Sequence, residues 1–368
     1  MSFENTYRGK KILVTGHTGF KGSWLCTWLL NLGAKVVGYS IDIPTQPSLF
    51  ESLGLDKKIN HNIGDLSNLD ALKSLIKNEK PDFVFHLAAQ AIVSTSYAEP
   101  IKTLQTNIMG TAHILEALRS VDWKCSAVLI TSDKCYENVE WVWGYKETDH
   151  LGGKDMYSAS KAGAEIVIRG YFESFFKKQK FVRMATGRAG NVIGGGDWAQ
   201  DRIIADTMRA WYDKSTLQIR SPKATRPWQH VLEPLSGYLL LGQGLDKDES
   251  FHGQSYNFGP KAEQNRTVVE LIEDLGKFWP EKNSKPFFEI TENRPFNEAG
   301  LLKLNCDKAL FDLKWQATLD YQQTVKFVGE WYFKDYQKTE NVFDFTQKQI
   351  SEYIQFARQI GVSWAKPL

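Results

Sequence analysis

Two short segments of the chain carry residues suited to proton and hydride transfer. Ser132, Asp133 and Lys134 follow an apolar run over residues 127–130, and Tyr157 and Lys161 stand four residues apart at the start of a helical pattern. A Tyr and a Lys at this spacing share one helix face. A nearby ammonium favours the phenolate, so we expect Tyr157 to act as a base near neutral pH. Ser132 is expected to hydrogen-bond the same substrate oxygen.

Asp133 and Lys134 add two titratable groups beside Ser132 at the same end of the expected site. Oxidation of a simple alcohol needs only Ser132, Tyr157 and Lys161, so the extra pair predicts a further proton-transfer step after the oxidation. The alternative is that Asp133 and Lys134 merely form a salt bridge.

A glycine-rich turn predicts a dinucleotide site. Gly16, Gly19 and Gly22 form Gly-x-x-Gly-x-x-Gly between a predicted strand and a predicted helix. Glycines allow the backbone to approach a pyrophosphate, which rests on the helix N-terminus. Asp42 lies 20 residues beyond Gly22, where a carboxylate accepts from the adenosine ribose and repels a 2′-phosphate. NAD is therefore favoured over NADP, although Asp42 before Pro44 also suits an ordinary turn.

Other residues near these motifs complete the predicted cofactor site. Asp65 is placed to bond the adenine amine. Solvent exposure is the simplest expectation for both His17 and Lys21. For Lys21, a contact with cofactor phosphate or ribose is equally expected. His86 reads as a packing residue at a strand end. The remaining candidates are Thr18, Phe20, Leu66, Leu87, Ala88 and Ala89, together with Tyr157 and Lys161.

Strands and helices alternate along the first half of the chain. This pattern predicts an α/β fold, a Rossmann-type doubly wound parallel sheet with ligands at the carboxyl ends of its strands. We expect an NAD-binding domain over residues 1–187, completed by segments near 230–258, and a smaller mixed α/β substrate-binding domain over 188–368. The expected strands are 11–15, 35–40, 83–86, 127–130 and 181–185; the expected helices are 20–33, 67–79 capped by Ser67, 97–119, 157–176 and 343–360.

Composition excludes several classes of protein. The 368 residues carry a net charge of +2, with no basic run for nucleic acid. No apolar run approaches the ~20 residues that span a bilayer. The N-terminus lacks a signal-peptide apolar core, and the four cysteines contain no Cys-x-x-Cys, so we expect a cytoplasmic protein with reduced thiols. No His/Cys/Asp spacing predicts a metal site.

Together these motifs resemble the extended short-chain dehydrogenase/reductase superfamily. Its Thr-Gly-x-x-Gly-Phe-x-Gly and Tyr-x-x-x-Lys patterns match residues 15–22 and Tyr157 with Lys161. Sugar-nucleotide 4,6-dehydratases of the superfamily carry Asp-Glu where this chain has Asp133 and Lys134. Segments 47–51, 131–138, 140–145, 151–153 and 187–198 are similar to the CDP-glucose 4,6-dehydratase family.

The resemblance implies an NAD-dependent lyase that converts CDP-glucose to CDP-4-dehydro-6-deoxyglucose and water. It also implies a place in deoxysugar biosynthesis for surface polysaccharides such as the lipopolysaccharide O-antigen, and a homodimer or homotetramer. Lys134 would be the base of the elimination and Asp133 the acid. A lysine serves as a base only if its pKa falls well below ~10.4, which burial and the charge of Lys161 would promote.

The nucleotide sugar carries two phosphates. Asn191 resembles the superfamily residue that contacts the diphosphate, and we favour Arg202, Arg220 and Arg294 as its cationic partners. Cytosine recognition rests on resemblance alone. The alternatives are a nucleotide-sugar 4-epimerase, a 4,6-dehydratase for another nucleotide sugar, and a nonenzymatic NAD-binding scaffold.

Overall fold

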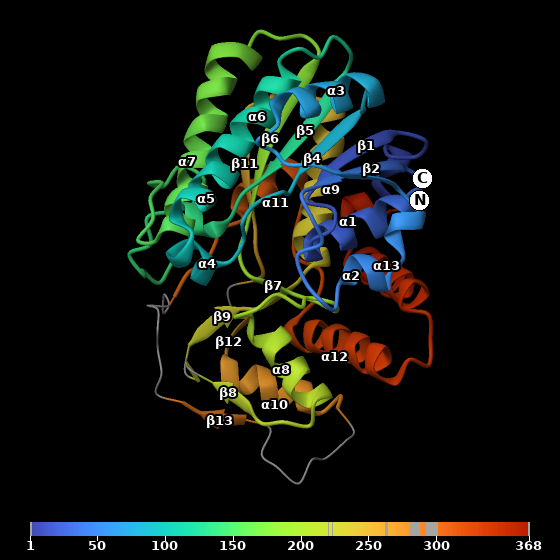
Figure 1. Cartoon of the computed structure of the whole chain (residues 1–368), viewed down its shortest axis with the longest axis vertical. Helices are drawn as coiled ribbons and strands as arrows, with labels where there is room; N and C mark the ends of the chain where they lie inside the picture. Colours follow the sequence, from blue (N-terminus) through green and yellow to red (C-terminus); the bar gives the residue numbers. More distant parts are fainter. Residues whose placement is uncertain are drawn as a thin grey trace.

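The computed structural model describes residues 2–219, 221–222, 224–261, 264–279, 288–291 and 301–366. Its centre is a seven-stranded sheet in the order β11-β6-β5-β4-β1-β2-β3, in which every neighbouring pair is parallel (Figure 1). The strands are β1 (Lys11–Thr15), β2 (Lys35–Ser40), β3 (Asn60–Ile63), β4 (Phe83–His86), β5 (Cys125–Ile130), β6 (Val182–Ala189) and β11 (Ser255–Phe258). The predicted Rossmann-type sheet is confirmed.

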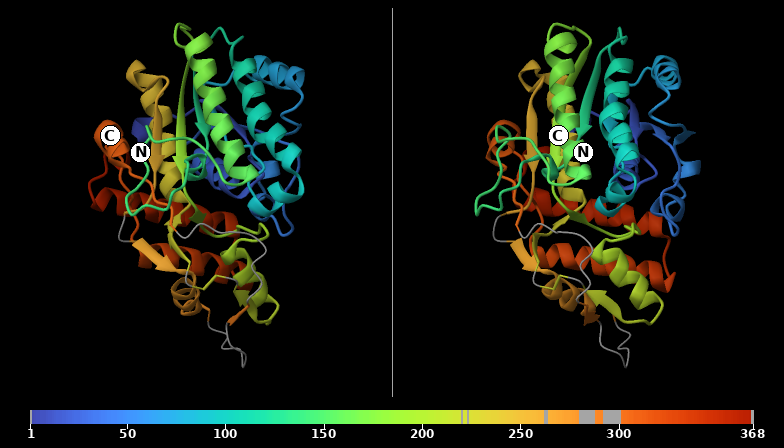
Figure 2. Two further views of the ribbon diagram at one scale, coloured as in Figure 1. Left: turned by 90° about the vertical axis from the view of Figure 1, so that its left-hand side faces the viewer. Right: turned by 60° about the vertical axis from the view of Figure 1, so that its left-hand side comes forward.

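Helices cover both faces of the sheet (Figures 1 and 2). The core on one face includes α3 (Leu69–Glu79), α6 (Gly110–Leu118) and α7 (Met156–Tyr171). The core on the other face includes α1 (Phe20–Asn31), α9 (Leu232–Lys247) and α13 (Val342–Gln359). Strands buried on both sides need continuous apolar runs, such as the one over 127–130.

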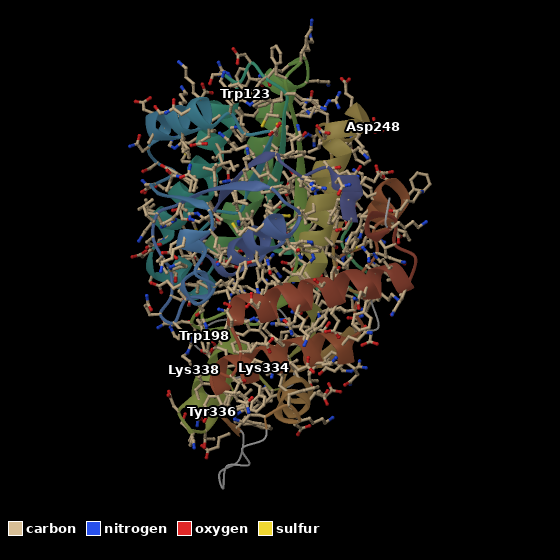
Figure 3. All side chains as sticks on the ribbon, turned by 90° about the vertical axis from the view of Figure 1, so that its right-hand side faces the viewer. Trp123, Trp198, Asp248, Lys334, Tyr336 and Lys338 are labelled. Carbon is tan, nitrogen blue, oxygen red and sulfur yellow. The ribbon has the colours of Figure 1, made fainter. Side chains whose placement is uncertain are left out.

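A smaller unit lies beyond the carboxyl ends of the strands (Figure 1). It contains the short strand pairs β7–β10, β8–β13 and β9–β12, which lie beside α8, α10 and α12. Their bounds are β7 (Val192–Ile193), α8 (Ile203–Tyr212), β8 (Leu217–Ile219), β9 (Thr225–Pro227), β10 (Gln229–His230), β12 (Asn265–Thr267), α10 (Val268–Gly276), β13 (Phe288–Ile290) and α12 (Tyr321–Gln337). Trp198, labelled in Figure 3, packs edge-on against Tyr212 and Tyr332 of this unit. The domain division at residue 187 stays a prediction, and strand β11 joins the main sheet beside β6.

The helix expected over 97–119 is broken in the structure. It consists of α4 (Val93–Ala98), α5 (Pro100–Leu104), a π-helical turn (Gln105–Met109) and α6. Pro100 opens α5 because its fixed φ and missing N–H suit a first helical position and interrupt a preceding helix.

Two further expectations needed correction. Asn68, not Ser67, caps α3, since its side chain accepts from the Ala71 N–H at 3.0 Å. Strand β3 was missed because Asn60, His61 and Asn62 give this edge strand no apolar alternation. Three further short helical segments are α2 (Leu49–Ser52), α11 (Asp307–Leu313) and the turn Asp133–Cys135.

In the described part of the chain, no helix is long and apolar enough to cross a membrane. Nor do the His, Cys, Asp and Glu side chains described there gather into a group suited to a metal ion.

Candidate active site

A cavity of about 1910 Å³ opens where the strand order reverses, between β1 and β4. This switch point is where doubly wound sheets bind ligands. Pockets for one small molecule usually measure about 300–1,000 Å³, so this cavity has room for two ligands side by side. The glycine-rich turn, the segment around Ser132 and the start of α7 all line it.

In the glycine-rich turn, Gly16 and Gly22 leave no room for a side chain within the protein, whereas Gly19 leaves room for a ligand at the start of α1. Gly16 has φ of +75°, and a Cβ there would lie 2.7 Å from the Ala88 nitrogen. A Cβ on Gly22 would lie 2.1 Å from the Gly16 carbonyl oxygen, whereas one on Gly19 would meet nothing closer than 3.4 Å. Gly19 is the N-cap of α1 and offers no capping side chain. The N-terminal N–H groups of α1 therefore suit a pyrophosphate.

The residues expected to hold the rest of a dinucleotide lie along the same wall. The Thr18 hydroxyl donates to the Asp42 carbonyl at 2.6 Å, and Asp65 caps the Ser67 N–H at 2.8 Å. The Asp42 and Asp65 side chains are exposed at the cavity. Lining residues from the predicted set are Gly16, Thr18, Gly19, Phe20, Lys21, Gly22, Asp42, Asp65, Leu66, Leu87, Ala88, Ala89, Tyr157 and Lys161. Their chemistry fits NAD, and their individual roles stay predictions.

His17 is buried, so the expectation of solvent exposure was wrong. Its ring hydrogen-bonds Ser40 Oγ at 2.9 Å through Nδ1 and His61 Nδ1 at 2.6 Å through Nε2. Burial, and then His61, lower the pKa of His17 to about 4. This neutral imidazole ties the glycine-rich turn, of which His17 is part, to β2 and β3.

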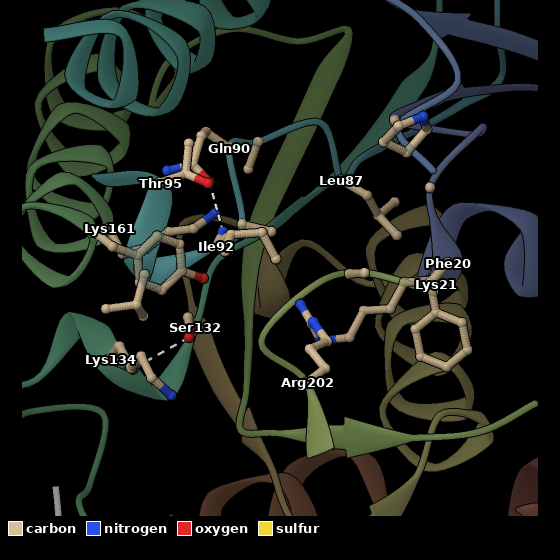
Figure 4. A pocket seen from close by; sticks show the side chains of 18 of the residues that line it. Phe20, Lys21, Leu87, Gln90, Ile92, Thr95, Ser132, Lys134, Lys161 and Arg202 are labelled. Atoms are coloured by element: carbon tan, nitrogen blue, oxygen red, sulfur yellow. Dashed lines mark hydrogen bonds between the residues drawn. The ribbon is translucent and has the colours of Figure 1, made fainter. Parts of the chain in front are cut away.

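Lys21 is not a surface residue either. Its side chain reaches the part of the cavity where Asp133, Lys134 and Lys161 lie, and its Nζ lies 5.9 Å from the centroid of the Tyr238 ring. Burial, and then Arg202, lower the pKa of Lys21 to about 7, against the opposing charge of Asp133. Figure 4 shows Ser132, Lys134 and Lys161 on one side of the cavity and Phe20, Lys21 and Leu87 on the other.

Helix α7 presents Tyr157 and Lys161 at its first turns. Asp155 caps the helix by accepting from the Ser158 N–H at 2.9 Å. Tyr157 and Lys161 are 7% and 6% exposed, and the Lys161 Nζ lies 5.9 Å from the centroid of the Tyr157 ring.

The protein groups alone do not produce the phenolate expected near neutral pH. Burial raises the pKa of Tyr157 to about 12, although a hydrogen bond with Ser132 and the charge of Arg202 lower it. Burial also lowers the pKa of Lys161 to about 8. Desolvation therefore outweighs the charge effect that the Tyr–Lys spacing predicts.

Ser132, Asp133 and Lys134 lie together at the end of β5. The Ser132 hydroxyl donates to Asp133 Oδ1 at 3.0 Å, and Asp133 is buried as the acid role requires. Lys134 Nζ donates to Asn191 Oδ1 at 3.2 Å and lies 3.7 Å from Asp133 Oδ1. The ion pair considered as an alternative is thus present. The burial expected for Lys134 is incomplete, because its side chain is 26% exposed.

The predicted diphosphate residues lie in part near the catalytic groups. Arg202 lines the cavity and pairs with Asp197 at 3.4 Å, and its charge acts on Tyr157 and Lys21. Asn191 lines the cavity beside Lys134. Arg220 and Arg294 lie outside the described residues.

Two buried tryptophans, Trp198 and Trp228, belong to the core and also line the cavity. Trp198 and Trp228 are each 4% exposed, and the Trp228 indole donates to the Arg266 carbonyl at 3.0 Å. His230 is buried beside Trp24 and Phe327, and burial lowers its pKa to about 3. It is a packing residue.

Sequence reasoning missed a buried ion pair beneath this site, formed by Glu165 and Arg188. Two signals were available. Glu165 follows Lys161 by one helical turn, and Arg188 interrupts an otherwise uncharged stretch of strand after Met184.

Comparison with known proteins agrees with this geometry. Residues 13–328 match the family described as GDP-mannose 4,6 dehydratase. The chain is 44% identical to CDP-glucose 4,6-dehydratase of Salmonella typhimurium over 355 residues, 95% of this chain and 98% of the relative. It is 24% identical to dTDP-glucose 4,6-dehydratase of Haemophilus influenzae over 342 residues, 87% of this chain and 97% of the relative.

Solved structures show the same fold. UDP-glucose 4-epimerase of Thermotoga maritima aligns with a TM-score of 0.75 at 21% identity, covering 88% of this chain and 99% of that one. DesIV, a dTDP-glucose 4,6-dehydratase of Streptomyces venezuelae, aligns with a TM-score of 0.73 at 21% identity, covering 90% and 99%. The chain therefore belongs to the GDP-mannose 4,6 dehydratase family, within the short-chain dehydrogenase/reductase superfamily that its glycine-rich turn and Tyr-x-x-x-Lys motif predict.

Proposed function

We propose that this protein is an NAD-dependent CDP-glucose 4,6-dehydratase, which converts CDP-glucose to CDP-4-dehydro-6-deoxyglucose and water. The observation that carries the proposal is the meeting of Asp133 and Lys134 with Ser132, Tyr157 and Lys161 in one cavity large enough for two ligands. The 44% identity to the Salmonella typhimurium enzyme supports CDP-glucose as the substrate.

Bound NAD would supply a hydride acceptor for C4 of the sugar and a hydride donor for C6, so that no net oxidation occurs. Tyr157 takes the proton of the 4-hydroxyl, and Ser132 hydrogen-bonds the same oxygen. Lys161 holds positive charge beside the phenolate that forms. Gly16, Gly19 and the N-terminus of α1 hold the pyrophosphate, and Asp42 holds the adenosine ribose.

The new 4-ketone acidifies the C5 proton. Lys134 takes that proton, while Asp133 gives a proton to the 6-hydroxyl, which leaves as water; once hydride has reached C6, the Lys134 ammonium returns a proton to C5. The 3.7 Å between Lys134 Nζ and Asp133 Oδ1 places base and acid side by side, and passage of one proton from the Lys134 ammonium to the Asp133 carboxylate converts their ion pair into the neutral amine and carboxylic acid that the elimination needs. Arg202 and Asn191 bind the diphosphate of the substrate.

We also propose where and in what state the enzyme acts. It works in the cytoplasm, in the synthesis of deoxysugars for surface polysaccharides such as the lipopolysaccharide O-antigen. A homodimer or homotetramer would cover the exposed apolar residues Ile101, Met109 and Ile166, which are 65%, 50% and 61% exposed along α5 to α7.

Mass spectrometry of products separates this function from its competitors. The protein is incubated with CDP-glucose, UDP-glucose or dTDP-glucose, with and without NAD. We expect a product lighter by one water, formed fastest from CDP-glucose and dependent on NAD. A product of unchanged mass would indicate a 4-epimerase, a preference for another nucleotide would move the assignment to a different 4,6-dehydratase, and NAD binding without conversion would indicate a scaffold.

A further inference from the structure

A buried ion pair lies directly beneath the catalytic segment and has no part in the chemistry described above. Arg188 of β6 binds Glu165 of α7 through two parallel hydrogen bonds, both of 2.8 Å. The side chains are 5% and 3% exposed. Burying two charges costs several kcal/mol per ion, and a well-packed apolar pair often stabilises a fold as well. Stability alone is therefore a weak reason for this pair.

The pair is bonded to both ends of the segment that carries Ser132, Asp133 and Lys134. At one end the Thr131 hydroxyl donates to Glu165 Oε1 at 2.5 Å. At the other end Arg188 Nη1 donates to the Tyr136 hydroxyl at 2.7 Å.

Tyr136 in turn donates to Asn257 Oδ1 at 2.8 Å, and Arg188 Nη1 also donates to the Glu147 carbonyl at 3.1 Å. Three catalytic residues are thus held between two anchored neighbours. A segment of this length with fixed ends can present its side chains in one register.

Glu165 also lies one turn beyond Lys161 on the same helix face. The other titratable groups that act on Lys161 or feel its charge are Tyr157 of α7, Cys135 of the turn after β5, His86 of β4 and Lys21 at the start of α1. Burial raises the pKa of the Cys135 thiol well above its usual range and lowers that of His86 to about 3, so both are neutral at pH 7. Glu165 is therefore the anion that opposes the desolvation of Lys161.

We propose that Glu165 and Arg188 act together as a positioning pair: they hold Ser132, Asp133 and Lys134 in register against Tyr157, and Glu165 sets a carboxylate one helical turn from the Lys161 ammonium. The proposal rests on the proposed dehydratase function, because it assigns the pair to that reaction. Neither residue is expected to touch substrate or cofactor.

The first test removes the charge and keeps the shape. In Glu165→Gln the amide oxygen can still accept from Thr131, but the anion beside Lys161 is lost. Lys161 then holds its proton less well, so Tyr157 ionises at higher pH. We expect the acid limb of the pH–kcat profile to move to higher pH, with kcat reduced on that limb and the KM for CDP-glucose unchanged.

Glu233→Gln is the matched control. Glu233 of α9 is as buried as Glu165, but it accepts from the N–H groups of Thr318 and Leu319 and from the Tyr353 hydroxyl, away from the catalytic segment. Its pH–kcat profile should superimpose on that of the wild type. A shift of equal size in Glu233→Gln would show that loss of any buried carboxylate moves the profile, and would overturn the proposal.

Two milder variants test the anchors even if Glu165→Gln does not fold. Thr131→Val and Tyr136→Phe each remove one hydroxyl while keeping the volume of the side chain. We expect each to lower kcat several-fold with KM unchanged and with NAD binding intact. If the wild type dehydrates CDP-glucose and both variants match its kcat, the positioning role is wrong; if the wild type itself fails to dehydrate CDP-glucose, it is the proposed function that fails.

Discussion

Two alanine substitutions in the glycine-rich turn should separate the packing of the protein from the binding of its cofactor. In Gly22→Ala the new Cβ would lie 2.1 Å from the Gly16 carbonyl oxygen, although ordinary contact begins at 3.4 Å. The turn and the start of α1 must move apart. Overpacking of this kind costs about 1–3 kcal/mol, so we expect a lower melting temperature together with weaker NAD binding.

Gly19→Ala should behave differently. A Cβ on Gly19 would approach the Gly16 carbonyl oxygen to no less than 3.4 Å, and Gly19 has φ of −76°, which alanine adopts without strain. The fold should therefore tolerate the methyl group. The bound pyrophosphate would not, because it needs the space above the N-terminus of α1. A clash worth about 1–3 kcal/mol corresponds to a rise of roughly fivefold to 150-fold in the Kd for NAD.

Calorimetric titration with NAD and thermal unfolding without it measure the two effects. Gly170→Ala in α7 is the control, since a Cβ there meets nothing within 4 Å, and we expect no loss of either property. Normal NAD affinity in Gly19→Ala would show that the pyrophosphate lies elsewhere. Normal stability in Gly22→Ala would show that the turn is not packed as tightly as the structure indicates.

Three further predictions concern the proton-transfer groups and the pH dependence of stability. Tyr157→Phe should lower the rate of C4 oxidation about 10²–10⁴-fold, because the base for the 4-hydroxyl is gone. The rate is measured from NADH absorbance in a single turnover with CDP-glucose, and NADH formation at the wild-type rate would contradict the assignment. Lys134→Met should still form NADH but should not exchange the C5 hydrogen in deuterated water, and normal exchange and turnover would remove Lys134 from the mechanism. Burial raises the pKa of Glu233 to about 7, so the folded protein favours the neutral form of this side chain. The contribution of Glu233 to the free energy of unfolding is therefore complete below about pH 4.5 and is lost as the pH rises through 7. At about 1.4 kcal/mol per pKa unit, the free energy of unfolding of Glu233→Gln should rise by roughly 3 kcal/mol relative to that of the wild type between pH 4.5 and pH 8. Urea unfolding measures this difference, and a difference that does not change with pH would refute the reasoning.

Local sequence pattern predicted the buried strands well and the interrupted helices poorly. The limits of β1, β2 and β4 follow from apolar runs bounded by turn residues, which is the strongest signal a buried parallel strand can give. The π-helical turn after Leu104 has no such signal, because an apolar stripe continues through it. Asn68 and Ser67 are both good N-cap residues, so the choice between them depends on backbone dihedrals that the sequence does not carry.

The same distinction between local sequence signals and long-range contacts applies to the candidate site. Motif spacing placed the glycine-rich turn and Tyr157 with Lys161, since these depend on contacts between near neighbours in the chain. The burial of His17 depends on Ser40 and His61, and the orientation of Lys21 depends on Tyr238, all brought in by other elements. Long-range packing of this kind leaves no trace in a single sequence.

The charges of the cavity bear on how Tyr157, the proposed base, would lose its proton. Burial keeps Tyr157 protonated, with a pKa of about 12, and leaves Lys161 and Lys21 with pKa values of about 8 and 7. A buried phenol loses its proton more readily when positive charge is added beside it. The ring of oxidised nicotinamide carries such a charge, while the substrate diphosphate would draw Arg202 away from Asp197 and Tyr157. The two ligands would thus act on Tyr157 in opposite directions, and Lys161 is a cation on α7 that would stay beside the phenol in either case.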